Sequence, residues 1–271
     1  MAPIPWLLVA MLAGGQPAAP AGGQPATPAG VPEAAERLLE TGTVTRVKTL
    51  SKGITRPRKI TLTDGVVTHD AVFQSIDDEK PVERFGSGRI ELDFRDSYHF
   101  NIAAYRLARA IGLDHMVPPC VERVIRSERG SLCWWIDWQW DEQMRVKQKL
   151  RPPDPIRWQQ QWDAARVFGA LVEDTDRNQT NMLITGDWRL WMVDFSRAFR
   201  KTQALGRPDR LRRCPRALLD RLRALAEPDV RAAVGPHLRE AEIEGVLSRR
   251  RRIVDHFDAL VAERGEAAVL F

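Results

Sequence analysis

The two halves of this 271-residue chain have different hydrophobic periodicities, and this contrast limits the fold more than any other feature. In the first half, short runs rich in β-branched and aromatic residues lie between turn signals, which is typical of antiparallel strands. From Pro155 onward, apolar residues recur at helical spacing, as in residues 158–173. We therefore predict an α+β chain with a small, antiparallel β-rich lobe followed by a larger, mostly helical lobe.

The first half contains five predicted strands and one predicted helix. The strands are residues 41–50, 59–63, 66–76, 121–125 and 131–138. Asp64 and Gly65 form a strong hairpin signal between the second strand and the third. The helix begins after Ser97, a residue type that caps helices, and ends at Gly112. The predicted order is therefore three strands, a helix and two strands.

The first 32 residues are expected to lie outside both lobes. Residues 14–32 are mostly Ala, Gly, Pro and Gln, a composition that favours a disordered linker. Residues 5–13 resemble the apolar part of a secretory signal peptide, but no basic residue precedes them and the first is Arg37. Export and a cytoplasmic location therefore both stay open. The apolar run is too short for an ordinary transmembrane helix, and no transmembrane span is expected elsewhere.

Composition narrows the classes of function. A hydrophobic fraction of 44% and a charged fraction of 28% are ordinary for a soluble globular protein, and the net charge of +5 suits an anionic ligand such as a nucleotide. No nucleic-acid partner is expected, because the basic run at residues 249–252 lies in a predicted helix, where a solvated face is the simpler interpretation. The five histidines share no motif and receive no role.

The cysteines give no metal-binding pattern. The chain has three of them, Cys120, Cys133 and Cys214, with no spacing typical of a zinc site. Their odd number argues against a disulfide framework. One disulfide with a free thiol stays open.

The most informative segment for function is residues 173–199. It carries a carboxylate at Asp176, an amide five residues later at Asn181, and a second carboxylate at Asp194. Two short β segments separate Asn181 from Asp194 and predict a hairpin that brings them together. Phosphoryl transfer needs one carboxylate to orient the attacking hydroxyl, and an amide with a second carboxylate to hold Mg²⁺ against ATP. We therefore predict Asp176 as the catalytic base, and Asn181 and Asp194 as magnesium ligands.

Two other interpretations of this segment are weaker. Asp174, Asp176 and Asn178 resemble the start of a calcium loop, but Gln179 and Thr185 stand where such a loop needs Gly and Glu. The same residues could also form an Asx-rich turn after a helix, without chemistry. The spacing to Asp194 and the preceding order of strands and helix favour the phosphoryl-transfer site.

The spacing resembles that of the protein-kinase-like superfamily, which places Asp and Asn five residues apart in the catalytic loop and a magnesium-binding Asp after it. An Arg directly after the Asp, here Arg177, resembles the phosphatidylinositol 3-/4-kinases and HipA-like bacterial kinases. In those families a His usually follows, and here Asn178 replaces it. Residues 101–109 and the extended Val117-Pro118-Pro119 connection resemble the same branch.

The resemblance covers roughly residues 45–200 and implies a two-lobed kinase-like fold. The lobes would be residues 33–140 and 141–271, after an N-terminal segment of residues 1–32. ATP and Mg²⁺ would be the cofactors, and Arg177 would brace the catalytic loop.

Two positions depart from the resembled families. Those families pair a Lys on the third strand with a Glu in the following helix, whereas this chain has Gln74 and Asn101 there. Because two neutral amides can hydrogen-bond to each other, we expect Gln74 and Asn101 to face each other. The change removes the cation that holds the phosphates. A basic residue of a nearby loop could supply it, and the candidates are Lys52, Lys80, Arg84 and Arg89.

The sequence therefore predicts an ATP- and Mg²⁺-dependent phosphotransferase acting on an unidentified hydroxyl of a protein, a lipid or a small molecule. Asp176, Asn181 and Asp194 favour this enzyme. Gln74 and Asn101 favour an alternative, a pseudokinase with the same fold that binds a nucleotide or a partner. A third alternative is an unrelated α+β binding protein.

Overall fold

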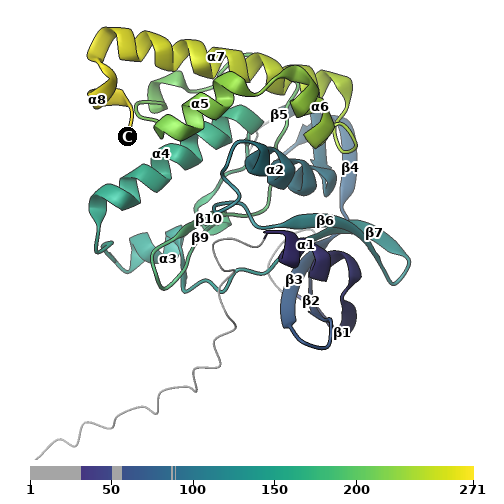
Figure 1. The fold of residues 1–271 in the computed structure, drawn as a ribbon. Coiled ribbons are helices and arrows are strands. Elements are labelled where there is room, and N and C mark those ends of the chain that lie inside the picture. The colour runs from purple at the N-terminus through teal and green to yellow at the C-terminus, as the bar shows by residue number, and fades with distance from the viewer. Residues whose placement is uncertain (1–31, 51–56, 87, 89) are drawn as a thin grey trace, which may run out of the picture.

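The computed structural model describes residues 32–50, 57–86, 88 and 90–271. The apolar N-terminal run, nearly all of the linker, Lys52 and Arg89 lie outside these residues. The described chain forms a β-rich lobe followed by a mostly helical lobe (Figure 1). This confirms the predicted two-lobed α+β arrangement. No helix in the described ranges is long and apolar enough to cross a membrane.

A five-stranded antiparallel sheet forms the first lobe, in the order β1-β2-β3-β7-β6. The strands are β1 (Thr43–Thr49), β2 (Arg58–Thr63), β3 (Thr68–Gln74), β6 (Cys120–Ile125) and β7 (Glu128–Trp134). Each overlaps a predicted strand. In β3, alternate residues such as Ala71 and Phe73 are buried, as in a strand with one face in the core. Helix α1 (Pro32–Thr41) joins the same core cluster through Leu38 and Leu39.

A separate hairpin of β4 (Asp77–Arg84) and β5 (Ile90–Ser97) was not predicted from the sequence. Strand β4 is rich in charged residues and contains a proline, a composition that is depleted in strands. The hairpin lies beside the C-terminal helices rather than in the five-stranded sheet (Figure 1). An ion pair of 2.6 Å between Arg95 and Glu242 joins it to the start of α7.

The second lobe is mostly helical. Its helices are α3 (Glu142–Lys147), α4 (Pro155–Val172), α5 (Arg216–Ala224), α6 (Glu227–Val234), α7 (Glu240–Arg264) and α8 (Glu266–Val269), with short 3-10 helices η1 (Gln179–Asn181) and η2 (Pro208–Arg210). A three-stranded sheet is formed by β8 (Trp140–Asp141), β9 (Met182–Ile184) and β10 (Leu190–Met192). Helix α2 (His99–Ala110) packs against both β6 and α6 and so connects the lobes. Tyr105, Phe168 and Phe257 belong to one core of α2, α4 and α7.

The expectation that the basic run at residues 249–252 forms a solvated helix face is wrong for Arg249. Its side chain is fully buried, and Nε donates to the carbonyl of Leu171 at 2.9 Å. Nη1 donates to the carbonyl of Arg200 at 2.8 Å. Carbonyl oxygens thus replace water as acceptors, and Arg249 fastens the end of α4 to the loop after Phe199. Arg251 and Arg252 are exposed, as expected.

Cys120 on β6 and Cys133 on β7 stand opposite each other and form a disulfide. Cys214 is a buried free thiol. The arrangement is the one left open by the sequence, one disulfide with a free thiol.

Candidate active site

Helix α4 ends in a turn that begins the predicted catalytic loop. Glu173 has a left-handed backbone conformation (φ 46°), which stops the helix and redirects the chain. The short helix η1 follows. Its cap is Asn178, whose side chain accepts a hydrogen bond from the backbone N–H of Thr180 at 2.9 Å. Asn178, which stands where the families that the sequence resembles carry a histidine, therefore shapes the loop.

The predicted hairpin is present and is made of β9 and β10. Met182 pairs with Met192 at its open end. The backbone N–H of Val193 donates to the carbonyl of Asn181 at 3.0 Å, so the hairpin brings Asn181 next to the residue that precedes Asp194. Asp194 has a left-handed backbone (φ 57°), a conformation that is uncommon outside glycine and recurs at functional sites.

Arg177 connects the loop to both ends of this hairpin. Its Nη1 donates to the carbonyl of Asn181 at 3.0 Å and to that of Val193 at 2.5 Å. The guanidinium also pairs with Asp174 and lies 4.2 Å from the centroid of the Phe195 ring. A bracing residue would make contacts of this kind.

Asp176 lies on the exposed side of the loop, with 48% of its side chain accessible, and its Oδ2 is 3.8 Å from Nη1 of Arg197. A third carboxylate, Asp96 on β5, lies close to it and to Asp194. Burial raises the pKa of Asp96, a hydrogen bond with Ser196 opposes this, and the charges of Asp194 and Asp176 raise it further. Sequence reasoning missed Asp96 because it did not predict β5.

A cavity of about 460 Å³ lies between the five-stranded sheet and the β9–β10 hairpin, and we call it the cleft cavity. Its walls are mostly apolar, with Val72, Trp135, Ile136, Trp138 and Leu183 among them. The polar or charged side chains that line it are Gln74, Asn101, Asp141, Thr180, Asn181 and Asp194. Its size and character are those of a small-molecule site. Asp176 and Arg177 are not among the lining residues.

Gln74 and Asn101 meet in this cavity, as predicted. Nδ2 of Asn101 donates to Oε1 of Gln74 at 2.7 Å, and both side chains are buried. Oδ1 of Asn101 accepts the backbone N–H of Phe195 at 2.7 Å, so α2 is tied to the residue that follows Asp194. The pair is neutral and hydrogen-bonded, so it buries no unpaired charge.

Among the described residues that line the cleft cavity, none is Lys, Arg or His. Lys80 lies on β4, where its Nζ is 3.1 Å from Asp78 and 2.7 Å from Glu83. Arg84 is exposed on the same strand, and neither side chain lines the cavity. Lys52 and Arg89 lie in segments that the structure does not describe.

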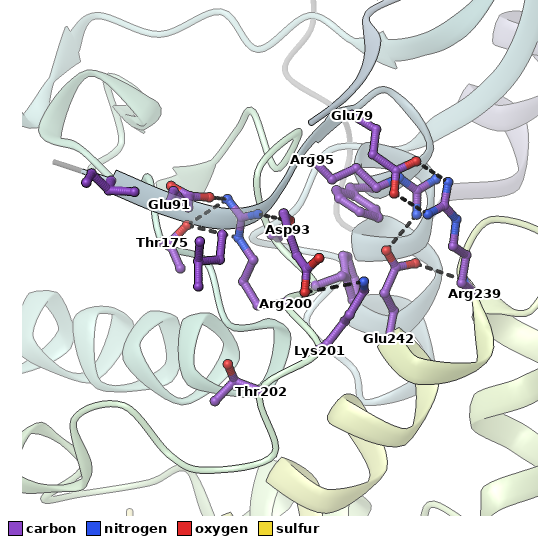
Figure 2. A pocket seen from close by; sticks show the side chains of 15 residues that line it. Glu79, Glu91, Asp93, Arg95, Thr175, Arg200, Lys201, Thr202, Arg239 and Glu242 are labelled. Atoms are coloured by element: carbon purple, nitrogen blue, oxygen red, sulfur yellow. Dashed lines mark hydrogen bonds and ion pairs between the residues drawn. The ribbon is translucent and has the colours of Figure 1, made fainter. Parts of the chain in front are cut away.

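A second cavity, of about 450 Å³, is lined by β5, by the loop after Phe199 and by the start of α7 (Figure 2). We call it the charged cavity because ion pairs dominate its walls. Figure 2 shows Arg200 pointing to Glu91 and Lys201 to Asp93, the latter pair at 3.6 Å. Farther along, Arg239 pairs with Glu79.

The charged cavity lies next to the predicted base. Thr175, the neighbour of Asp176, is one of its lining residues. Arg197 connects the two places, since its Nη2 is 2.6 Å from Oε2 of Glu91 and its Nη1 faces Asp176. The loop of residues 175–181 thus contributes to both cavities.

No known protein-family model matches the chain, and no curated protein sequence matches it. Several solved structures, in contrast, superpose on the chain. A hydra Fam20 structure with sugar superposes with a TM-score of 0.62 at 14% identity, covering 87% of this chain and 90% of that one. A Golgi casein kinase with Mn/ADP bound gives 0.60 at 14% identity, covering 88% and 78%. The Helicobacter pylori proinflammatory kinase CtkA gives 0.51 at 10%, covering 84% and 98%.

The fold is therefore that of a protein-kinase-like protein, with a β-rich N-terminal lobe and a helical C-terminal lobe. The alternative of an α+β fold unrelated to the kinases is therefore removed. At identities this low the likeness concerns the fold alone, and it does not confirm the branch of phosphatidylinositol kinases and HipA-like kinases.

Proposed function

We propose that this chain is a phosphotransferase that moves the terminal phosphoryl group of ATP to a hydroxyl acceptor, with a divalent cation. The observation that carries the proposal is that one hairpin places Asn181 and Asp194 in the same cavity, with Asp176 on the same loop. Asp176 then orients or deprotonates the acceptor hydroxyl, and Asn181 and Asp194 hold the cation. Arg177 holds the loop of residues 175–181 against both ends of the β9–β10 hairpin.

The donor set fits a hard divalent cation. An amide oxygen and a carboxylate are ligands that Mg²⁺ and Mn²⁺ prefer, and Asp96 provides a further carboxyl group nearby. Because no cationic side chain lines the described part of the cleft cavity, the metal ion is the main source of positive charge for the phosphates. When bound, the ion neutralises charge on the transferring phosphoryl group. Because the Golgi casein kinase structure contains manganese and ADP, the activity should be tested with Mn²⁺ as well as with Mg²⁺.

The apolar part of the cleft cavity suits the nucleotide base. Trp135 and Trp138 belong to the segment that connects the two lobes, and Leu183 lines the cavity from the C-terminal lobe. Flat aromatic rings and an aliphatic side chain favour a planar base over a flexible chain. The phosphates would then extend toward Asn181 and Asp194.

The charged cavity is our proposed acceptor site. Asp176 is accessible from solvent, and Arg197 connects it to Glu91 in the cavity wall. Walls of paired charges suit a polar acceptor with several hydroxyls or charged groups. The sugar in the hydra Fam20 structure adds sugars to the acceptors to test, beside proteins and phosphatidylinositol lipids.

The test measures phosphate transfer from labelled ATP by the full-length chain, with Mg²⁺, Mn²⁺ or a chelator, to casein, simple sugars and phosphatidylinositol vesicles. We expect metal-dependent transfer to one acceptor class, lost in Asp176→Asn and Asp194→Asn. Asp187→Asn is the matched control, because this exposed aspartate lies in the β9–β10 turn and lines neither cavity. Transfer that survives both active-site changes would contradict the proposal.

The Gln74–Asn101 pair favours a second candidate function, a pseudokinase that binds a nucleotide without transferring phosphate. The pair is buried, satisfied and neutral, so the fold does not need the usual ion pair. Nucleotide binding with no transfer, to any acceptor or to water, would select this function.

We also propose that the protein works in an oxidising compartment. Disulfides such as Cys120–Cys133 persist mainly in exported proteins and are rare in the cytosol. The signal-like residues 5–13 agree with export. Fractionation of expressing cells, with thiol labelling under denaturing conditions, tests this. A reduced Cys120 in protein isolated without reductant would argue against it.

A further inference from the structure

Two of the five histidines, which share no motif in the sequence, meet in space, and neither lines the cleft cavity or the charged cavity. His99 is the first residue of α2, and His237 lies between α6 and α7. Their Nδ1 atoms are 3.4 Å apart, although 138 residues separate them in the chain. Glu122 on β6 completes the group, with Oε2 3.9 Å from Nδ1 of His99. One nitrogen or oxygen from each of the three side chains lies within 4.8 Å of the others.

We propose that His99, Glu122 and His237 form a zinc site that fastens α2 and the edge of the N-terminal sheet to the helical lobe. Two imidazoles and one carboxylate are a known zinc ligand set. Two nitrogens that bind a tetrahedral zinc ion at about 2.0–2.1 Å lie about 3.4 Å apart. The observed nitrogen separation matches this value.

The surroundings of His237 support a bound ion. The residue is 8% exposed, and the one side-chain polar contact of its Nδ1 in the described part of the chain is the long approach to His99. A contact of that length satisfies a buried ring nitrogen poorly, and a zinc ion bound between the two Nδ1 atoms would replace it.

Hydrogen bonds from two neighbouring side chains hold the Glu122 carboxylate in place. The hydroxyl of Tyr98 donates to Oε2 of Glu122 at 3.2 Å, and Nη1 of Arg129 donates to Oε1 at 2.9 Å. Hydrogen bonds of this kind orient metal ligands and tune their affinity. His99 keeps 23% of its side chain exposed, which leaves a path for the ion to enter.

Zinc bound at this site would stabilise the fold and would take no part in phosphate transfer. His99 and Asn101 lie within the same first turn of α2, and Asn101 holds the backbone N–H of Phe195. An ion bound to His99 would therefore fix the end of α2 that faces the cleft cavity. This inference does not depend on the proposed phosphotransfer.

The test titrates Zn²⁺ into chelator-treated, full-length protein by calorimetry and by thermal unfolding. The background is Asp194→Asn with excess Mg²⁺, so that the proposed nucleotide-metal ligands cannot account for zinc binding. We expect one zinc ion per chain and a higher Tm. His99→Gln should weaken binding by more than about 100-fold, since loss of a hydrogen-bond partner behind a metal ligand alone commonly costs about 10–100-fold. His115→Gln is the matched control, because that histidine is exposed and lies outside the group.

X-ray absorption at the zinc edge provides a second readout, with two imidazole nitrogens expected at about 2.0–2.1 Å. His237→Gln repeats the test at the buried ligand. If that variant does not fold, His99→Gln decides the question, because His99 is partly exposed. No zinc binding by the parent protein, or equal affinity in His99→Gln, overturns the proposal and leaves a simple imidazole pair.

Discussion

The cleft cavity and the charged cavity have almost the same volume, about 460 and 450 Å³, but opposite chemistry. The first has apolar walls, two carboxylates and a neutral amide pair. The second has cations and anions that pair with each other, as Arg200 does with Glu91. Both receive residues from the loop of residues 175–181.

The difference shows which of the two cavities lacks a charged partner for its proposed ligand. In the charged cavity, positive side chains are already present, and their pairs also join the β4–β5 hairpin to the helical lobe. The described walls of the cleft cavity offer no positive charge to a triphosphate. Nucleotide binding should therefore depend strongly on the metal ion, whereas changes in the charged cavity should affect the acceptor and stability.

The largest expected effect is that of Asp194→Asn. Removing the carboxylate takes away a proposed metal ligand in the cleft cavity, whose described walls carry no cationic side chain, so phosphate transfer should fall by at least about 10³-fold. Metal-dependent ATP binding should be lost with it, as measured by titration of Mg²⁺–ATP and Mn²⁺–ATP. Asp187→Asn should leave both unchanged. Equal ATP affinity with and without metal in the unsubstituted protein would remove the basis of this comparison.

Asp176→Asn should separate chemistry from nucleotide binding. Asp176 does not line the cleft cavity, so the Kd for metal–ATP should stay within about twofold, while kcat falls by about 10²–10⁴-fold, as for a lost general base. The measurement pairs equilibrium ATP binding with transfer rates at saturating acceptor. A parallel loss of affinity and rate would assign Asp176 to the nucleotide instead.

The elements around the cleft cavity could be predicted from the sequence better than those around the charged cavity. Strand alternation, the Asp64-Gly65 turn and the spacing from Asn181 to Asp194 are local signals, and they predicted the sheet and the hairpin correctly. The β4–β5 hairpin has no such signal, because β4 has no apolar alternation and its partner Arg239 lies 160 residues from Glu79. Asp96 was missed together with it.

Two further features depend on distant contacts in the same way. Arg249 appears in the sequence as part of a basic run, and its burial is set by carbonyl oxygens that lie up to 78 residues away. The meeting of His99 and His237 depends on packing between α2 and α6. Helix periodicity gives the faces of single helices, but it does not say which helices meet.

Glu91→Gln should affect stability and leave nucleotide binding unchanged. Glu91 pairs with Arg197 and Arg200, and all three side chains are only 12–13% exposed. Neutralising it should lower the free energy of unfolding by about 2 kcal/mol, below the roughly 3–5 kcal/mol for a fully buried pair. Denaturant unfolding measures this, with Glu263→Gln, an exposed glutamate of α7, as the control. A changed ATP affinity would mean that the two cavities are not independent.

The smallest expected effect comes from restoring charge to the cleft cavity. Gln74→Lys together with Asn101→Glu replaces the hydrogen-bonded amides by an ion pair of similar reach, and should tighten metal–ATP binding by about tenfold, or about 1.4 kcal/mol. Gln74→Lys alone should help less, because a buried ammonium without its carboxylate is costly. Asn101→Glu alone should weaken binding, since it adds negative charge near the phosphates.

The double-mutant cycle over the four proteins gives the coupling free energy between the two positions, for which we expect about 1 kcal/mol or more. Adenosine is the matched control ligand, because it lacks phosphates and its affinity should not follow the added cation. A coupling near zero in folded variants would mean that the two positions do not act as a pair toward the phosphates. In that case the positive charge must come from the metal ion alone or from a basic residue such as Lys52 in the segments beyond the described residues.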